Sequence, residues 1–134
     1  MKLSFRRLTH EDYDILIDWW KSWPDWVPLG RSLLPENGTG GIMIERDGVP
    51  IVAGFLYSTN SKIAWMEWII SNPKEKNKSE AIVLLISSLE KWAKDGNFEV
   101  ILSIGRSKSL IEKHKKLGYT VDKDPSYEIT KNIQ

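Results

Sequence analysis

The chain has 134 residues, with 19 basic and 18 acidic side chains and a formal net charge of +1. This balance excludes a global field that would attract nucleic acid or an anionic membrane, and the length gives room for one domain with one core. No cysteine is present, which excludes disulfides, thiolate metal sites and a cysteine nucleophile. No run approaches the ~18 apolar residues of a membrane span and the start does not resemble a signal peptide, so we expect a cytoplasmic protein.

The first third of the chain predicts a strand, a helix and a long loop. Residues 2–8 alternate apolar and polar side chains, as a short strand does. Thr9 offers an N-cap for a helix whose apolar stripe runs to about Trp23, where Pro24 ends it. In the loop that follows, only residues 32–34 predict a helical turn. A segment this long inside a small domain is usually functional or mobile.

Three antiparallel strands are predicted next. Residues 41–45 and 49–59 are joined through Asp47-Gly48, a strong hairpin signal, and Gly54 indicates a bulge in the second of these strands. A turn then leads into a third strand over residues 62–71, which completes a meander.

The pattern then changes to a helix and a parallel strand. Apolar side chains from Ala81 to Ala93 keep helical spacing, and Gly96 is placed to close this helix. Residues 98–104 form an almost continuous apolar run, which predicts a strand covered on both faces. A strand, a helix and a strand in this order predict a right-handed crossover with a parallel pair.

The last part predicts one helix and two strands. Ser109 and Glu112 predict a capping box for the helix, and Gly118 would stop it. Residues 119–121 and 127–133 are interpreted as the final strands.

A polar loop at residues 72–79 leads directly into the start of the long helix. The unpaired N–H groups there, together with the helix macrodipole, favour an anion, and the lysines of the loop favour a phosphate. The alternative is that this lysine-rich loop is only a solvated turn.

Two short patterns sharpen this hypothesis. Pro73 is followed by Lys76-Asn77-Lys78-Ser79-Glu80-Ala81, and a second series contains Ser107, Leu110, His114, Gly118 and Tyr119. With the element order, these resemble the GNAT superfamily of acyl-CoA-dependent N-acyltransferases along essentially the whole chain. The resemblance implies a single α/β (α+β) domain over residues 1–134. Its mixed, mostly antiparallel sheet would have six to seven strands, a central βαβ crossover and flanking helices.

The resemblance also implies acetyl-CoA as co-substrate and no metal. In the family, main-chain groups at the end of the fourth strand hold the pantetheine arm, and a loop Arg/Gln-x-x-Gly-x-Gly/Ala holds the pyrophosphate. The matching positions here are Ile69, Ile70, Ser71, Lys76, Asn77, Lys78, Ser79, Glu80, Ala81 and Ser107. The loop departs from the pattern, since Lys76 lacks the fork of an arginine and Ser79 replaces a glycine. Glu80 adds a carboxylate beside the expected diphosphate.

The implied reaction is direct attack of an amine on the thioester. Glu67 corresponds to the carboxylate that serves as general base in many relatives, although a solvated strand residue would look the same. His114 falls where the family has a tyrosine that protonates the leaving thiolate, and an imidazolium can serve as that acid. The alternative is a surface histidine beside two lysines.

The acceptor is expected near the end of the first helix, where four tryptophans crowd together. Trp20 follows the apolar stripe of that helix and is interpreted as core. Trp23 and Trp26 are the better candidates for a pocket that receives an apolar or cationic amine, and Arg31 could select its charge. We expect a small-molecule or peptide amine, no nucleic acid or membrane, and a monomer or homodimer. The alternative function is a non-catalytic module of this fold that binds CoA or a peptide without turnover.

Overall fold

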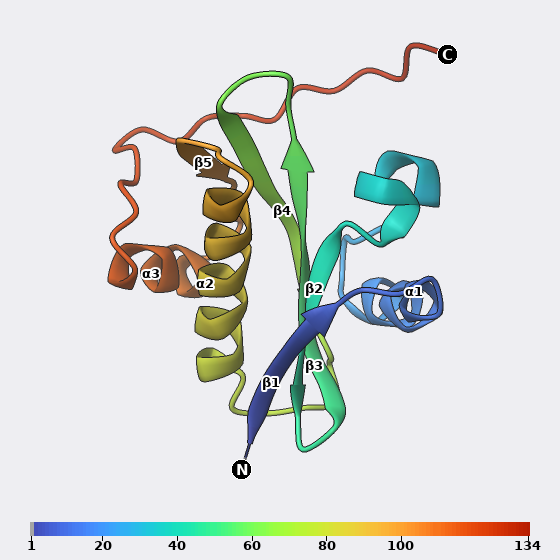
Figure 1. The fold of residues 1–134 in the computed structure, drawn as a ribbon. Coiled ribbons are helices and arrows are strands. Elements are labelled where there is room, and N and C mark those ends of the chain that lie inside the picture. The colour runs from blue at the N-terminus through green and yellow to red at the C-terminus, as the bar shows by residue number, and fades with distance from the viewer. Residues whose placement is uncertain (1) are drawn as a thin grey trace.

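The computed structural model describes residues 2–134. The elements in chain order are β1 (Leu3–Arg7), α1 (Asp12–Ser22), two short 3-10 helices (Arg31–Leu33 and Pro35–Gly38), β2 (Gly41–Arg46), β3 (Val49–Ser58), β4 (Ile63–Ser71), α2 (Ser79–Asp95), β5 (Val100–Ser103) and α3 (Lys108–Lys116). The sheet has the order β1-β2-β3-β4-β5 (Figure 1), with antiparallel pairing from β1 to β4 and a parallel pair of β4 with β5. The predicted meander and parallel pair are therefore confirmed.

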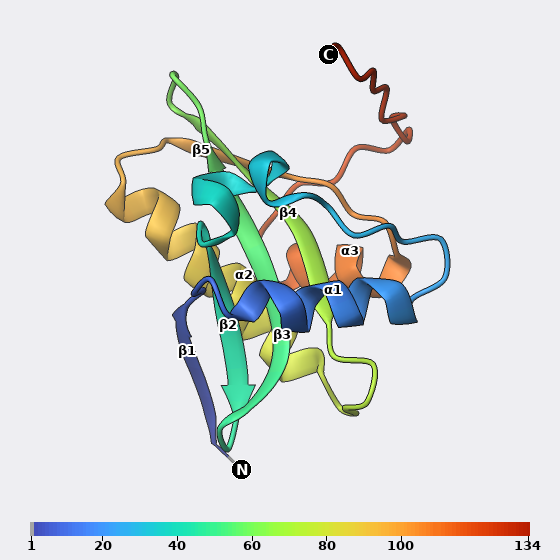
Figure 2. The same cartoon turned by 90° about the vertical axis from the view of Figure 1, so that its right-hand side faces the viewer.

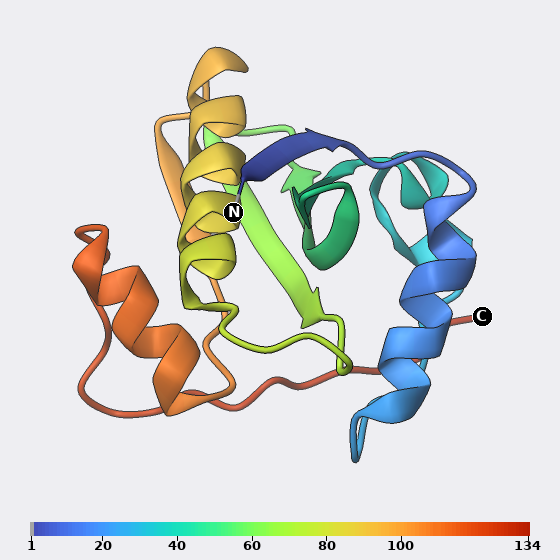
Figure 3. The same cartoon turned by 90° about the horizontal axis from the view of Figure 1, so that it is seen from below.

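Helices cover both faces of the sheet. Figures 1 and 3 show α1 on one face, with α2 and α3 on the other. Trp20 of α1 and Phe55 of β3 are fully buried on the α1 side, whereas Leu85 and Leu89 of α2 pack on the opposite side. Each such side chain contributes about 1.5–3 kcal/mol of burial, so the two apolar helix faces hold the sheet between them. The interpretation of Trp20 as core is confirmed.

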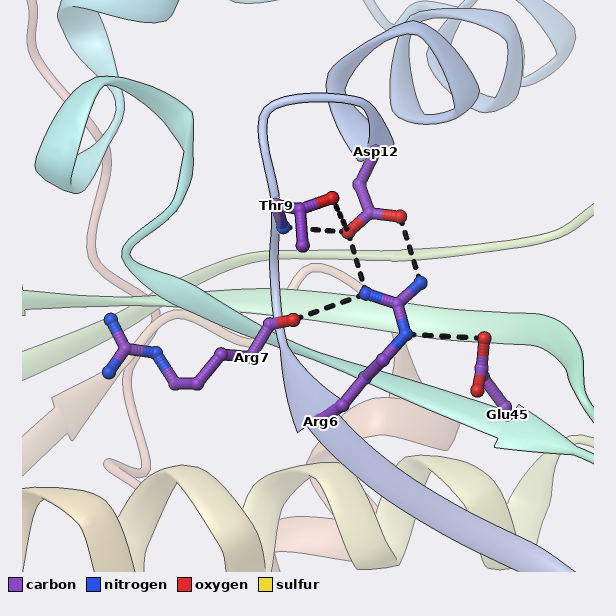
Figure 4. Close-up of polar contacts among 5 residues, drawn as sticks. All are labelled: Arg6, Arg7, Thr9, Asp12 and Glu45. Carbon is purple, nitrogen blue, oxygen red and sulfur yellow. Dashed lines mark hydrogen bonds and ion pairs between the residues drawn. The ribbon is translucent and has the colours of Figure 1, made fainter.

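The first helix begins later than its predicted cap. Thr9 does not cap α1: the carboxylate of Asp12, the first helical residue, accepts from the Thr9 N–H at 2.8 Å and from its hydroxyl at 3.2 Å. The same carboxylate receives two hydrogen bonds from the guanidinium of Arg6, at 2.7 and 2.9 Å (Figure 4). Asp12 is only 3% exposed, so this pair anchors the start of α1 to β1.

The predicted cap of α3 is also wrong. Ser107, in extended backbone conformation, is the N-cap, and its hydroxyl accepts from Leu110 N–H at 3.2 Å. Ser109 lies inside the helix, where its hydroxyl accepts from Lys113 Nζ. The helix starts at Lys108 because Ser107, the residue before it, is still extended and its hydroxyl can accept from an N–H of the first turn.

The two predicted C-terminal strands are absent from residues 2–134, so the sheet has five strands rather than six to seven. Helix α3 ends at Lys116, and Gly118 follows it with a φ of 90°, so the predicted stop at Gly118 is confirmed. Tyr119 forms no strand: its N–H bonds to the His114 carbonyl and its ring packs on the His114 ring. Tyr127 and Ile129 are 89% and 92% exposed, so no facing layer holds their alternating pattern in a sheet. The expectation that the strand within residues 98–104 is covered on both faces is wrong too. This strand, β5, lies at the edge of the sheet, and its Val100 is 50% exposed.

Candidate active site

The strands β4 and β5 separate part of the way along. Their pairing runs from Ile63 with Val100 to Met66 with Ser103, where β5 ends. Strand β4 continues to Ser71, so its residues 67–71 have no β5 partner. Figure 2 shows β4 running on beyond the parallel pair toward the loop that leads into α2. We call the space between residues 67–71 of β4 and the chain that follows β5 the gap.

A bulge in β4 lies where this gap opens. Glu67 pairs with Phe55 and Ile70 pairs with Ala53, so two residues of β4 oppose the single Gly54 of β3. Trp68 has a φ of 58°, a conformation that is unusual for a large side chain. Because a bulge bends its strand and increases the twist, it directs β4 away from β5. The predicted bulge at Gly54 is confirmed, with the extra residue on the neighbouring strand.

The gap is narrow as the chain stands. Its cavity has a volume of about 20 Å³, which is room for about one water molecule. Its lining includes Trp26 from the α1 side, Glu67 and Ile69 of β4, Ser103 of β5 and Arg106 beyond it. A larger hollow of about 670 Å³ lies between β1 and α2 and contains none of the predicted site residues. Any thioester in the gap therefore requires its lining side chains to move.

Glu67 is held by two partners. Its carboxylate accepts from the Trp68 N–H at 3.0 Å and from Arg106 Nη1 at 2.6 Å, and its side chain is 11% exposed. The guanidinium of Arg106 lies 4.9 Å from the Trp68 ring centre and also donates to Glu128 at 2.8 Å. Burial would lower the pKa of Arg106, but the bonds and charge of Glu67 outweigh it and raise that pKa. The alternative of a merely solvated Glu67 is wrong.

The end of β4 is partly occupied by the chain's own groups. Asn72 N–H bonds to the Ile51 carbonyl and Ile70 pairs with Ala53, so the alternation of the ladder turns the backbone groups of Ile69 and Ser71 toward the gap. The carbonyl of Ser71 accepts from Trp23 Nε1 at 2.9 Å. Trp23, predicted for the acceptor pocket, thus contacts the backbone predicted for the pantetheine arm.

The loop before α2 presents free amides. In the part of the chain that the structure describes, no hydrogen bond engages the backbone N–H groups of residues 76–81. Arg46 Nη2 donates to the Lys76 carbonyl at 2.8 Å, and Asn77 has a φ of 55°. The loop is thus held by its carbonyls while its amides remain available for an anion. Lys76, Asn77, Ser79 and Glu80 are exposed, whereas Ala81 is buried.

Lys78 turns back toward β4. Its Nζ donates to the Ser71 hydroxyl and the Asn72 carbonyl, both at 3.1 Å, and lies 5.1 Å from the Trp23 ring centre. Burial lowers the pKa of Lys78, while the charge of Glu75 opposes that shift. The ammonium therefore lies between the β4 end and the free amides, where a phosphate would meet it.

His114 is buried rather than on the surface, so the alternative of a surface histidine is wrong. It is 4% exposed, its ring meets that of Tyr119 edge-on at 5.0 Å, and its Nδ1 is 2.9 Å from the Leu110 carbonyl. A carbonyl only accepts, so Nδ1 carries the hydrogen of this bond. Nε2 is buried and has no partner in the described chain. Leu110 lines the gap and His114 lies one helical turn beyond it.

Two further predicted residues lie in different places. Trp26 lines the gap and meets the Trp68 ring edge-on at 6.4 Å. Arg31 does not line it: its guanidinium lies 4.2 Å from the Tyr13 ring centre and donates to the His10 carbonyl, near the opposite end of α1 from Trp23. Ser107 is the α3 cap, next to Arg106.

Arg106 is the site residue that the sequence interpretation missed. It lies three residues after the end of β5, in the short link to α3, at the carboxyl end of a parallel strand. Ligands of open α/β sheets bind at such ends, so its position was a usable signal. Within residues 2–134 no cluster of acidic or histidine side chains forms a metal site, and no helix is long and apolar enough to cross a membrane.

No protein-family model matches the sequence, and no curated protein is similar to it in sequence. Solved structures match it closely in fold. The ribosomal-protein-S18-alanine N-acetyltransferase from Escherichia coli superposes with a TM-score of 0.70 at 11% identity, over 87% of this chain and 77% of its own.

Two more solved structures cover nearly the whole chain. A predicted acetyltransferase from Clostridium acetobutylicum, solved with acetyl-CoA, has a TM-score of 0.65 at 16% identity over 96% of both chains. AAC(6')-Iy, solved with the bisubstrate analog CoA-S-monomethyl-acetylneamine, has a TM-score of 0.64 at 14% identity over 98% of this chain and 100% of its own. The chain therefore has the fold of the GNAT acetyltransferases.

Proposed function

We propose that residues 1–134 form a single acyltransferase domain that moves an acetyl group from acetyl-CoA to an amine in a ternary complex. The observation that carries this proposal is the gap, with free amides at residues 76–81 beyond the end of β4. The fold supports it, because acetyltransferases solved with acetyl-CoA or with a bisubstrate analog superpose along the whole chain.

The chain's groups fit the cofactor in two places. The amides of residues 76–81 and the ammonium of Lys78 suit a diphosphate, since both are hydrogen-bond donors with positive charge behind them. The backbone groups of Ile69 and Ser71 face the gap, where an extended amide-bearing arm could continue the ladder. Acetyl-CoA supplies an acyl group activated as a thioester.

Glu67 is proposed to take the proton of the acceptor amine. It lies where the strands diverge, and its carboxylate is already fixed by Trp68 N–H and Arg106. These two bonds fix the position of the carboxylate, so the amine and its proton acceptor can be held in one geometry. The indole walls of Trp26 and Trp68 would shield the acceptor from water.

His114 is proposed as the proton donor to the leaving thiolate. The Leu110 carbonyl fixes the hydrogen on Nδ1, so only the imidazolium has a proton on Nε2 to give. The chain therefore needs the charged ring for this role.

Binding and turnover are separate tests. Calorimetry with acetyl-CoA should show binding in wild-type protein, and Lys76→Glu should weaken it about tenfold because it reverses a charge beside the phosphates. Lys94→Glu is the matched control, since it makes the same change at the far end of α2. No binding at millimolar acetyl-CoA, or equal effects of both variants, would remove the cofactor proposal.

Thiol release with a panel of amines then tests the reaction. Amine-dependent release of free CoA is expected, with the acetyl group recovered on the amine. Binding without release for any amine would favour the non-catalytic module instead.

A further inference from the structure

The gap is closed by an arginine that already holds a carboxylate from another part of the chain. Arg106 divides its donors between two acids: Nη1 is 2.6 Å from Glu67 and Nη2 is 2.8 Å from Glu128. Nη2 lies 3.4 Å from the second oxygen of Glu67, a weaker contact. Nη1 therefore bonds to Glu67 alone, whereas Nη2 is shared between Glu67 and Glu128.

Glu128 is not part of the folded core. It belongs to the segment after α3, which crosses from the α3 side of the molecule to the α1 side without regular structure (Figures 1 and 3). Its neighbours Tyr127 and Ile129 are almost fully exposed, so local packing does not hold the Glu128 carboxylate against Arg106. The Glu128 side chain is 45% exposed, and a pair of this kind is worth little. A ligand can displace it.

Displacing Glu128 would leave two opposite charges side by side at the gap. Arg106 would offer Nη2 to an anion, and the Glu67 carboxylate lies next to it. Trp26 lines the same gap, and the Trp68 ring lies beside it under the Arg106 guanidinium. The ring of Trp26 could accept an ammonium group there. Such a site suits a molecule that carries an amine and a carboxylate.

We propose that Arg106 is a specificity-determining residue for an acceptor amine that also bears a carboxylate, and that Glu128 holds that carboxylate position in the absence of acceptor. This inference rests on the proposed acyl transfer, which defines Glu67 as the partner of the amine. It assigns the acceptor to the class of small amino acids and makes the C-terminal segment its intramolecular competitor.

The test compares ω-amino acids of increasing chain length with their carboxamides as acetyl acceptors. Wild-type protein should show a kcat/KM at least about tenfold higher for the best acid than for its amide, because the amide oxygen can accept from Arg106 but carries no negative charge to pair with it. Arg106→Gln should bring this ratio close to one. Taking the ratio within one variant cancels any change in the proton-accepting role of Glu67, which acts on acids and amides alike.

The competitor is tested by Glu128→Gln. It should lower KM for the acids about two- to fivefold and leave the amides unchanged. Asp124→Asn removes one negative charge from the same segment without removing a partner of Arg106. It should change KM for neither the acids nor the amides. Equal kcat/KM for acid and amide, an acid preference that survives in Arg106→Gln, or a Glu128→Gln effect shared by both series would overturn the proposal.

Failure of the proposed function can be told apart from failure of this inference. If no amine is acetylated, tryptophan fluorescence of the CoA-saturated protein titrated with the same acids and amides still reports the subsite. Acid-selective binding that is lost in Arg106→Gln would keep the subsite and remove the transferase. Acetylation without acid preference would keep the transferase and remove the subsite.

Discussion

Trp23 Nε1 donates a 2.9 Å hydrogen bond to the backbone carbonyl of Ser71, which joins the end of α1 to the end of β4. This carbonyl faces the gap, so the indole uses an acceptor that the proposed pantetheine arm would need. Trp23 therefore competes with the proposed cofactor for this atom.

Trp23→Phe should strengthen CoA binding. It frees the Ser71 carbonyl and keeps an aromatic ring under Lys78, and one hydrogen bond of about 0.5–1.5 kcal/mol corresponds to about two- to tenfold in Kd. Calorimetry with CoA measures this change. Trp65→Phe, at the paired end of β4, is the control and should leave Kd unchanged. Weaker binding in Trp23→Phe would mean that the indole supports the cofactor site instead.

Glu67→Gln should lower kcat at least about 100-fold while the Kd for acetyl-CoA stays the same. Glutamine keeps an oxygen that can accept from Trp68 N–H, so the bulge should persist and thermal stability should change little. Steady-state thiol release, calorimetry and a melting curve measure the three quantities. Glu112→Gln on the surface of α3 is the control. A variant with wild-type kcat would leave Glu67 with only a structural role.

His114→Phe should lower kcat at least about 100-fold while the Kd for acetyl-CoA stays the same, because phenylalanine has no proton to give to the leaving thiolate. Steady-state thiol release and calorimetry measure the two quantities, and phenylalanine preserves the edge-on packing against Tyr119. Wild-type kcat in the variant would end the assignment of His114 as the acid.

Asp12→Asn should destabilise the fold by about 2–3 kcal/mol at pH 7, since it breaks a buried pair whose other member, Arg6, is one third exposed. Burial would raise the pKa of Asp12, but the bonds from Arg6 and Thr9 lower it below 3.8. The carboxylate thus adds stability that is fully present above about pH 3.8 and is lost as the pH falls through the lowered pKa.

Urea unfolding of wild type and Asp12→Asn at pH 7 and pH 2 measures this contribution. The difference between them should shrink at the lower pH. Glu36→Gln removes the exposed pair with Arg7 and should cost under about 1 kcal/mol. A constant difference at both pH values would show that the asparagine acts through packing rather than charge.

The regular elements were predictable because each follows from local patterns. The stripe from Ala81 to Ala93, the turn at Asp47-Gly48 and the glycine at 54 act over a few residues, and the structure places α2, the hairpin and the bulge there. The two C-terminal strands were not predictable in this way. Residues 127–133 alternate as a strand does, but they form one only if a free sheet edge pairs with them and a neighbouring layer packs on their apolar side. Both conditions depend on the whole fold and not on the local sequence.

The candidate site was predictable in position but not in its contacts. The strand, loop and helix order located the gap and the amides of residues 76–81. The pairs of Glu67 with Arg106 and of Trp23 with Ser71 join residues 39 and 48 positions apart, which no local pattern reports. Arg31 shows the converse, since a charged loop residue near the tryptophans in sequence packs on Tyr13 in space.

The central claim is that acetyl-CoA binds between β4 and β5 with its diphosphate at the start of α2. An amide ¹⁵N NMR titration with acetyl-CoA tests it most directly. The predicted result is saturable shifts at Ile69, Ser71 and residues 76–81, with those of Phe5 and Leu84 beside the larger hollow unchanged. Shifts confined to the hollow between β1 and α2, or none at the loop amides at saturation, would contradict it.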